Sequence, residues 1–98
     1  MARNQVVISG KLIALDSLRY TPAGVARVEL VLLHVSQQPE AEGVRQVQCE
    51  VQALAFAGVA EKVTGFAVGQ SVKVRGFLAQ RSMRGRQLVL HINDIILE

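Results

Sequence analysis

Three arginines stand within six residues of one short polar segment. Residues 80–87 read QRSMRGRQ, so Arg81, Arg84 and Arg86 lie close together, with Gly85 between the last two and no acid nearby. The guanidinium group presents a fixed fork of donors, which suits it to phosphate oxygens. A solvated turn would explain the same residues, because turns are polar. The sharper hypothesis is a loop that holds an anionic ligand such as a nucleic acid.

The positive charge of the chain is concentrated around this segment. The 98 residues have a net charge of +3, yet residues 62–93 contain six cations and no acid. Residues 1–61 contain five cations and six acids and are therefore almost neutral. Such asymmetry points to a polyanionic partner, although charge by itself indicates only non-specific association.

The composition favours a compact protein of the cytoplasm. Half of the residues are hydrophobic, but no apolar run approaches the ~20 residues of a membrane helix. The first ten residues are strand-like and lack the apolar core of a signal peptide, so we expect a cytoplasmic protein. Cys49 is the single cysteine and excludes an intramolecular disulfide. It alternates with Val47 and Val51, so we expect a buried structural thiol.

No catalytic or metal-binding constellation is recognisable. His34 and His91 lie beside leucines, without Cys, Asp or Glu at the spacing of metal ligands, so we expect packed or edge histidines. There is no nucleophile with a nearby base and no glycine-rich phosphate loop before a helix. We therefore expect a binding protein rather than an enzyme, with no metal and no cofactor.

Alternating apolar and polar residues predict an all-β chain with one short helix. The pattern predicts strands at 4–15, 25–35, 45–53, 71–81 and 87–97, a turn at 16–24, a polar loop at 36–43 and a helix at 58–65. Five strands with a helix between the third and fourth are typical of a five-stranded Greek-key OB-fold barrel, here a single domain over residues 1–98. A five-stranded SH3-like barrel is the main alternative, but its helical turn precedes the last strand.

Two loops flank the ligand groove of an OB-fold, and both carry candidate residues here. The arginine segment forms the loop before the last strand, and Arg19 and Tyr20 lie in the loop after the first. Single-strand binders combine a cationic groove with rings on which bases stack, and Tyr20 is the best stacking candidate. Phe56 and Phe66 border the helix and are expected in the core.

Several segments resemble the bacterial single-stranded DNA-binding protein family. They are 4-NQVVISGKL-12, 19-RYTPAG-24 and 69-GQSVKVRGFL-78. The stretches 31-VLLHVS-36, 45-RQVQC-49 and 88-LVLHINDIIL-97 are similar, in order and spacing, to the small primosomal replication protein N (PriB) members of that family. The resemblance covers essentially the whole chain, and the absence of an acidic tail after the last strand favours the PriB group.

This resemblance implies an OB-fold homodimer that binds single-stranded DNA at stalled replication forks. It implies the PriA helicase and a DnaT-type loading protein as partners. It places the dimer interface on the first strand, at Arg3, Asn4, Gln5, Val6, Val7, Ile8 and Ser9. Together with the charge pattern it predicts nucleic-acid contacts from Arg81, Arg84, Arg86, Arg19, Tyr20, Arg27, Arg45, Gln48, Lys73 and Arg75.

Two positions depart from the pattern of the better-known family members. A tryptophan that stacks on DNA falls at Gln48 here, and a nearby aromatic residue falls at Gly43. Losing one stacking ring costs ~1–3 kcal/mol, so we expect DNA binding that is mostly electrostatic. A protein-interaction adaptor with only weak electrostatic nucleic-acid binding remains an alternative, and so does an RNA-binding barrel.

Overall fold

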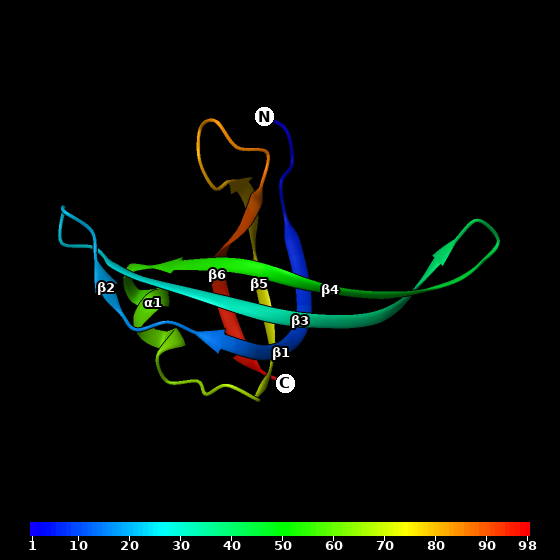
Figure 1. Cartoon of the computed structure of the whole chain (residues 1–98), viewed down its shortest axis with the longest axis horizontal. Coiled ribbons are helices and arrows are strands. Elements are labelled where there is room, and N and C mark those ends of the chain that lie inside the picture. Colours follow the sequence, from blue (N-terminus) through cyan, green and yellow to red (C-terminus); the bar gives the residue numbers. More distant parts are fainter.

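The computed structural model describes all 98 residues and contains six strands and one helix. Figure 1 shows the long strands coiled around a common centre, with the helix to one side. In chain order the elements are β1 (Val6–Leu15), β2 (Arg19–Tyr20), β3 (Ala26–Glu40), β4 (Gly43–Phe56), α1 (Ala57–Val63), β5 (Ser71–Gln80) and β6 (Leu88–Leu97).

The five long strands close into a barrel. The strand order is β1-β5-β6-β4-β3-β2, and an additional pairing of β1 with β3 completes the ring. All pairings are antiparallel except that of β4 with β6, which is parallel and joins only Ala53 to Leu90 and Leu54 to His91. We call this short parallel pairing the seam. The arrangement confirms the predicted OB-fold barrel, with its helix after the third long strand.

Alternation along the strands fills the barrel interior. Val28, Leu30 and Leu32 of β3 are almost fully buried, whereas the alternating residues Arg27 and Glu29 point outward. Helix α1 contributes Ala60 and Val63 to the same core cluster. Burial of this apolar surface is the main source of stability for such a small protein. No helix of the structure has the length and apolar character needed to span a membrane.

Strand β1 changes its partner half-way along its length. Residues 6–11 pair with β5, and residues 11–15 pair with β3. At the crossing, a Cβ atom on Gly10 would lie only 2.9 Å from the carbonyl oxygen of Leu33. Glycine therefore permits the close approach by which one strand serves two neighbours, as the mid-strand position predicts.

A second glycine allows the sharp bend in the β5–β6 pair. The register shifts between Arg75 and Gly76, and a Cβ atom at Gly76 would lie 1.8 Å from the carbonyl oxygen of His91. No side chain fits there, so the residue must be glycine. The shift leaves Asn93 of β6 without a partner and increases the local twist of the pair.

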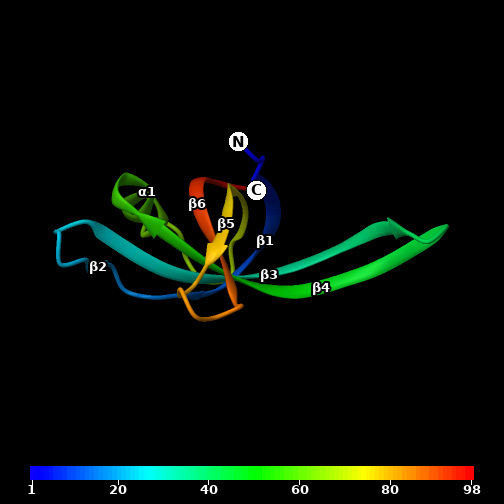
Figure 2. The ribbon, with the colours of Figure 1, turned by 90° about the horizontal axis from the view of Figure 1, so that it is seen from above.

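Beyond the barrel, β3 and β4 continue as a projecting hairpin, which we call the arm (34–40 paired with 43–49). The arm gives the molecule its elongated outline of 50 × 32 × 22 Å (Figures 1 and 2). The prediction of a polar loop at 36–43 is therefore wrong. The strands pair up to Glu40 and Gly43, and only Ala41 and Glu42 form the turn, with φ angles of 50° and 65°. Two successive residues with positive φ are the signature of the tight hairpin turn whose twist matches its strands.

The arm also corrects the expectation of a buried Cys49. Cys49 does share a face with Val51 and Ala53, as the alternation predicts, but it is exposed to solvent. Ala53 lies inside the barrel, whereas Cys49 lies where the two strands have left it and no third strand covers them. Alternation fixes the face on which a side chain lies, and coverage of that face depends on other strands.

Candidate nucleic-acid interface

The arginine loop is a compact turn held by its own hydrogen bonds. The backbone N–H of Arg81 donates to the carbonyl oxygen of Gln87 at 2.9 Å and closes the loop. The Gln80 side chain donates to the carbonyl oxygen of Gly85 at 2.9 Å, and the N–H of Gly85 donates to the Ser82 hydroxyl at 3.2 Å. These hydrogen bonds therefore hold the loop backbone from which the arginine side chains project.

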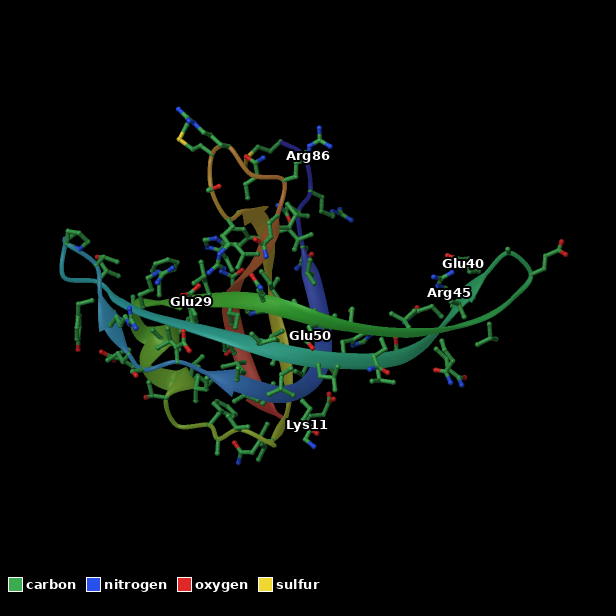
Figure 3. The ribbon with its side chains drawn as sticks, viewed as in Figure 1. Lys11, Glu29, Glu40, Arg45, Glu50 and Arg86 are labelled. Carbon is green, nitrogen blue, oxygen red and sulfur yellow. The ribbon has the colours of Figure 1, made fainter.

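The three arginines of the loop differ in their surroundings. Arg84 and Arg86 are exposed and form no ion pair or side-chain hydrogen bond. Figure 3 shows Arg86 at the outer end of the loop, pointing into solvent. Arg81 instead turns back onto the barrel, where it donates to the Glu29 carboxylate and, at 3.4 Å, to the side-chain oxygen of Gln52.

A second pair of arginines lies on the outer face of β2 and β3. Arg19 and Arg27 are cross-strand partners, so their side chains share one face of the sheet. Arg27 also forms an ion pair with Glu29, at 3.7 Å between Nη1 and Oε2. Glu29 thus joins Arg27 to Arg81, which is 54 residues away in sequence. We call Arg19, Arg27 and Arg81 the arginine cluster.

Next to this cluster lies a ring stack that the sequence did not reveal. Phe56 is the cross-strand partner of Arg27 on β4. Its ring stacks on that of His91, with centroids 5.8 Å apart, and His91 stacks on Phe77 at 5.0 Å. The three rings are half-buried and come from β4, β6 and β5. We call them the ring stack.

The ring stack changes the expected roles of its members. Phe56 was expected in the core, but it lies on the outer face because Ala55 beside it points inward. Phe66 does pack partly buried against the core, as expected. His91 is a packed histidine, as expected. The alternation of side chains along the strand already indicates this: Ala53 and Ala55 face inward, so Phe56, next to Ala55, faces outward.

The other predicted nucleic-acid residues are spread along the molecule. Tyr20 is 65% exposed next to Arg19, so its ring is available for stacking. Gln48 lies on the outer face of the arm, opposite Val35. Arg45 lies near the tip of the arm and forms an ion pair with Glu40 at 3.2 Å (Figure 3). Tyr20 pairs with the buried Ala26 and alternates with Arg19, so it lies on the opposite face of β2 from the arginine cluster. Arg45 and Gln48 lie apart from the cluster, along the arm.

Lys73 and Arg75 lie on a different part of the barrel. They are cross-strand partners of Ser9 and Val7, on the sheet formed by β1, β5 and β6. Six residues of extended strand, or about 20 Å, separate Arg75 from Arg81. Lys73 and Arg75 line a hollow together with Asp94. The Asp94 carboxylate accepts hydrogen bonds from the Lys62 ammonium group and from the backbone N–H of Ile95, and both lower its pKa. The structure thus sets Lys73 and Arg75 beside the predicted dimer strand and away from the arginine loop.

The segment expected at the dimer interface is partly engaged within the chain. The Asn4 side-chain amide donates to the carbonyl oxygen of Leu78 at 2.7 Å and accepts from its N–H at 3.0 Å. The His34 ring contacts the carbonyl oxygen of Ser9 at 2.7 Å and the Ser36 hydroxyl at 2.7 Å. The edge of residues 6–9 that faces away from β5 otherwise has no strand partner.

The sequence and the whole fold have counterparts among known proteins. Residues 4–94 match a family described as another single-strand binding protein family. The replication restart protein PriB of Nitrosomonas europaea is 45% identical over 92 residues, which cover 94% of this chain and 85% of that protein. The chain belongs to the PriB family of single-strand binding proteins.

Other PriB proteins and a more distant relative extend the match. The PriB of Shewanella woodyi is 36% identical over all of this chain and 99% of its own length. The solved structure of PriB from Ralstonia solanacearum superposes with a TM-score of 0.88 at 32% identity, covering 98% of both chains. The single-stranded DNA-binding protein of Thermus aquaticus reaches 0.77 at 26% identity, over 98% of this chain and 50% of that one.

Proposed function

We propose that this protein binds single-stranded DNA through the arginine loop, the arginine cluster and the ring stack, and serves replication restart in the cytoplasm. The relatives are named as replication restart and single-strand binding proteins. We propose that it helps the PriA helicase and a DnaT-type loading protein to assemble at stalled forks, as the family resemblance implies.

The observation that carries this proposal is the continuity of cations and rings on one face. Arg19, Arg27 and Phe56 are successive cross-strand partners on β2, β3 and β4, and the ring stack continues from Phe56 across β6 to β5. Cations can follow the phosphates of a single strand while exposed ring surfaces stack on its bases. The free Arg84 and Arg86 add two cations at the side of this surface.

Salt dependence of oligonucleotide binding tests the proposal. A fluorescent oligo-dT should bind more weakly as salt rises, with a slope of log K against log salt of about −0.7 for each phosphate neutralised. The double variant R84Q/R86Q should flatten this slope by about 1.4, because two phosphate contacts are lost. Its melting temperature should stay unchanged, because both side chains are exposed and form no ion pair or hydrogen bond.

A matched control removes the same charge elsewhere. The variant K11Q/K62Q also loses two positive charges, and both residues lie outside the proposed surface; Figure 3 shows Lys11 at the end of the molecule opposite Arg86. Its slope should equal that of the wild type. Affinity that is independent of salt, or an equal loss in the two double variants, would refute the proposed surface.

We also propose a homodimer formed through residues 3–9. The support is the unpaired edge of residues 6–9, since an open strand edge offers N–H and C=O groups to a second strand. Sedimentation equilibrium should give twice the mass of one chain at micromolar concentration. A monomer at every concentration would refute the dimer and leave the DNA surface, which lies on other strands, unaffected.

A further inference from the structure

An acidic side chain lies in the centre of the proposed DNA surface. The Glu29 carboxylate is only 29% exposed, and it lies between Arg27, at 3.7 Å, and Arg81. Figure 3 shows it on the outer face of β3. We propose, on the basis of the DNA-binding function proposed above, that Glu29 competes with DNA phosphate for these two arginines and thereby lowers the affinity of the protein for single strands.

Competition follows from the donors that Glu29 occupies. A phosphate uses the same guanidinium N–H groups that a carboxylate accepts from. Both terminal nitrogens of Arg81 already donate, one to Glu29 and one to Gln52. The Gln52 oxygen is itself shared with the Gln87 side chain at 3.0 Å, so Arg81 is held in a small network. A phosphate can take the Arg81 donor that faces Glu29 only when the Glu29 carboxylate is displaced.

The charge around Glu29 acts in the same direction. The hollow beside it, of about 160 Å³, is lined by two acids, Asp16 and Glu29, and by one cation, Arg81. Glu50 lies on the same outer face of β4, but four residues of extended strand, or about 13 Å, separate it from Leu54, the cross-strand partner of Glu29. A phosphate at this point therefore meets partly cancelled positive charge, unlike a phosphate next to Arg84 or Arg86.

The variant E29Q isolates this effect. Glutamine has the size of glutamate and can still accept a hydrogen bond from Arg81, so the network geometry is kept and only the charge is lost. Each additional neutralised phosphate raises single-strand affinity about fivefold at 0.1 M salt. E29Q should therefore bind oligo-dT about 5-fold to 25-fold more tightly, with a slope steeper by about 0.7 to 1.4.

Two matched variants separate competition from a general change of charge. E50Q removes an acid from the same face, and E61Q removes one from helix α1; neither acid forms an ion pair. Both should raise affinity less than E29Q and leave the slope unchanged. An equal gain of affinity in E29Q and E50Q would refute the inference, because the effect would then come from the general electrostatic field of this face of the barrel. Weaker binding by E29Q would also refute it and would make Glu29 a residue that positions Arg81 for DNA.

A double-mutant comparison tests whether the effect passes through Arg81. In the wild type, R81A should weaken binding by less than about twofold, because this arginine is already neutralised. In the E29Q background the same change should cost about fivefold, the value of one phosphate contact. Equal losses in the two backgrounds would refute the inference while DNA binding itself stands. If the wild type and all variants fail to bind oligo-dT, the proposed function and the inference about Glu29 are both refuted.

Discussion

The barrel and the arm are built from the same two strands, yet they have opposite surroundings. In the barrel, Leu32 of β3 is fully buried and pairs with Val51 of β4. Two pairs further along, on the same face, Cys49 is exposed opposite His34. The hydrogen-bonded ladder is continuous across this boundary. The comparison shows that two strands can pair without forming a core, and that a core forms only where β1, β5 and β6 also contribute.

The largest expected difference between the two regions is in packing energy. Leu32→Ala in the barrel should lower the free energy of unfolding by about 2–5 kcal/mol, because it leaves a cavity in a closed core. Val44→Ala in the arm, where the side chain is 72% exposed, should change it by less than about 0.5 kcal/mol. Urea midpoints of the two variants measure the contrast. A loss at Val44 as large as that at Leu32 would show that a second copy buries the arm.

A smaller effect is expected at the arm turn. Ala41 and Glu42 both have positive φ, which costs a residue with a Cβ atom about 1–2 kcal/mol. Replacing them with Asn-Gly, the preferred pair for this turn, should relieve part of that cost. Amide hydrogen exchange of the arm should slow, while the urea midpoint of the barrel stays nearly constant. A midpoint that rises by the full amount would mean that arm and barrel unfold as one unit.

The smallest expected effect concerns Cys49, and it sharpens the boundary between the two regions. Because this only cysteine is exposed, a thiol reagent should label one group in the native protein at a rate within about tenfold of that in urea. Cys49→Ser should leave the unfolding free energy within about 0.5 kcal/mol of the wild type. Labelling that slows as protein concentration rises would place Cys49 in an interface between copies.

Much of the barrel could be predicted from local patterns. The alternation of Val28, Leu30 and Leu32 with Arg27 and Glu29 identified a strand and its inner face, and the helix between the third and fourth long strands identified the fold. The arm could not be predicted in this way, because polar residues and Pro39 are typical of loops. Its pairing depends on the turn at Ala41 and Glu42, and its strands can be polar because no other layer covers them.

The site was predictable only where its residues are neighbours in sequence. Arg81, Arg84 and Arg86 could be identified together because all three lie in one short segment, whereas the turn of Arg81 back to Glu29 is seen only in the structure. The ring stack joins β4, β6 and β5, and the network around Glu29 joins residues more than fifty positions apart. Both depend on strand register, which is set by bulges such as that at Gly76 and is invisible to composition. The separation of Lys73 and Arg75 from the arginine loop has the same cause.

The seam gives the ring stack a mechanical meaning. Strands β4 and β6 are joined by only two residue pairs, and the contact of Phe56 with His91 crosses that junction from outside. Transient opening of the barrel should start there, because few hydrogen bonds must break. A DNA strand bound across Arg27 and the ring stack would contact both sides of the seam and stabilise it. Binding at the outer surface should therefore slow the hydrogen exchange of the backbone amides of Ala53 and Leu90 inside the barrel.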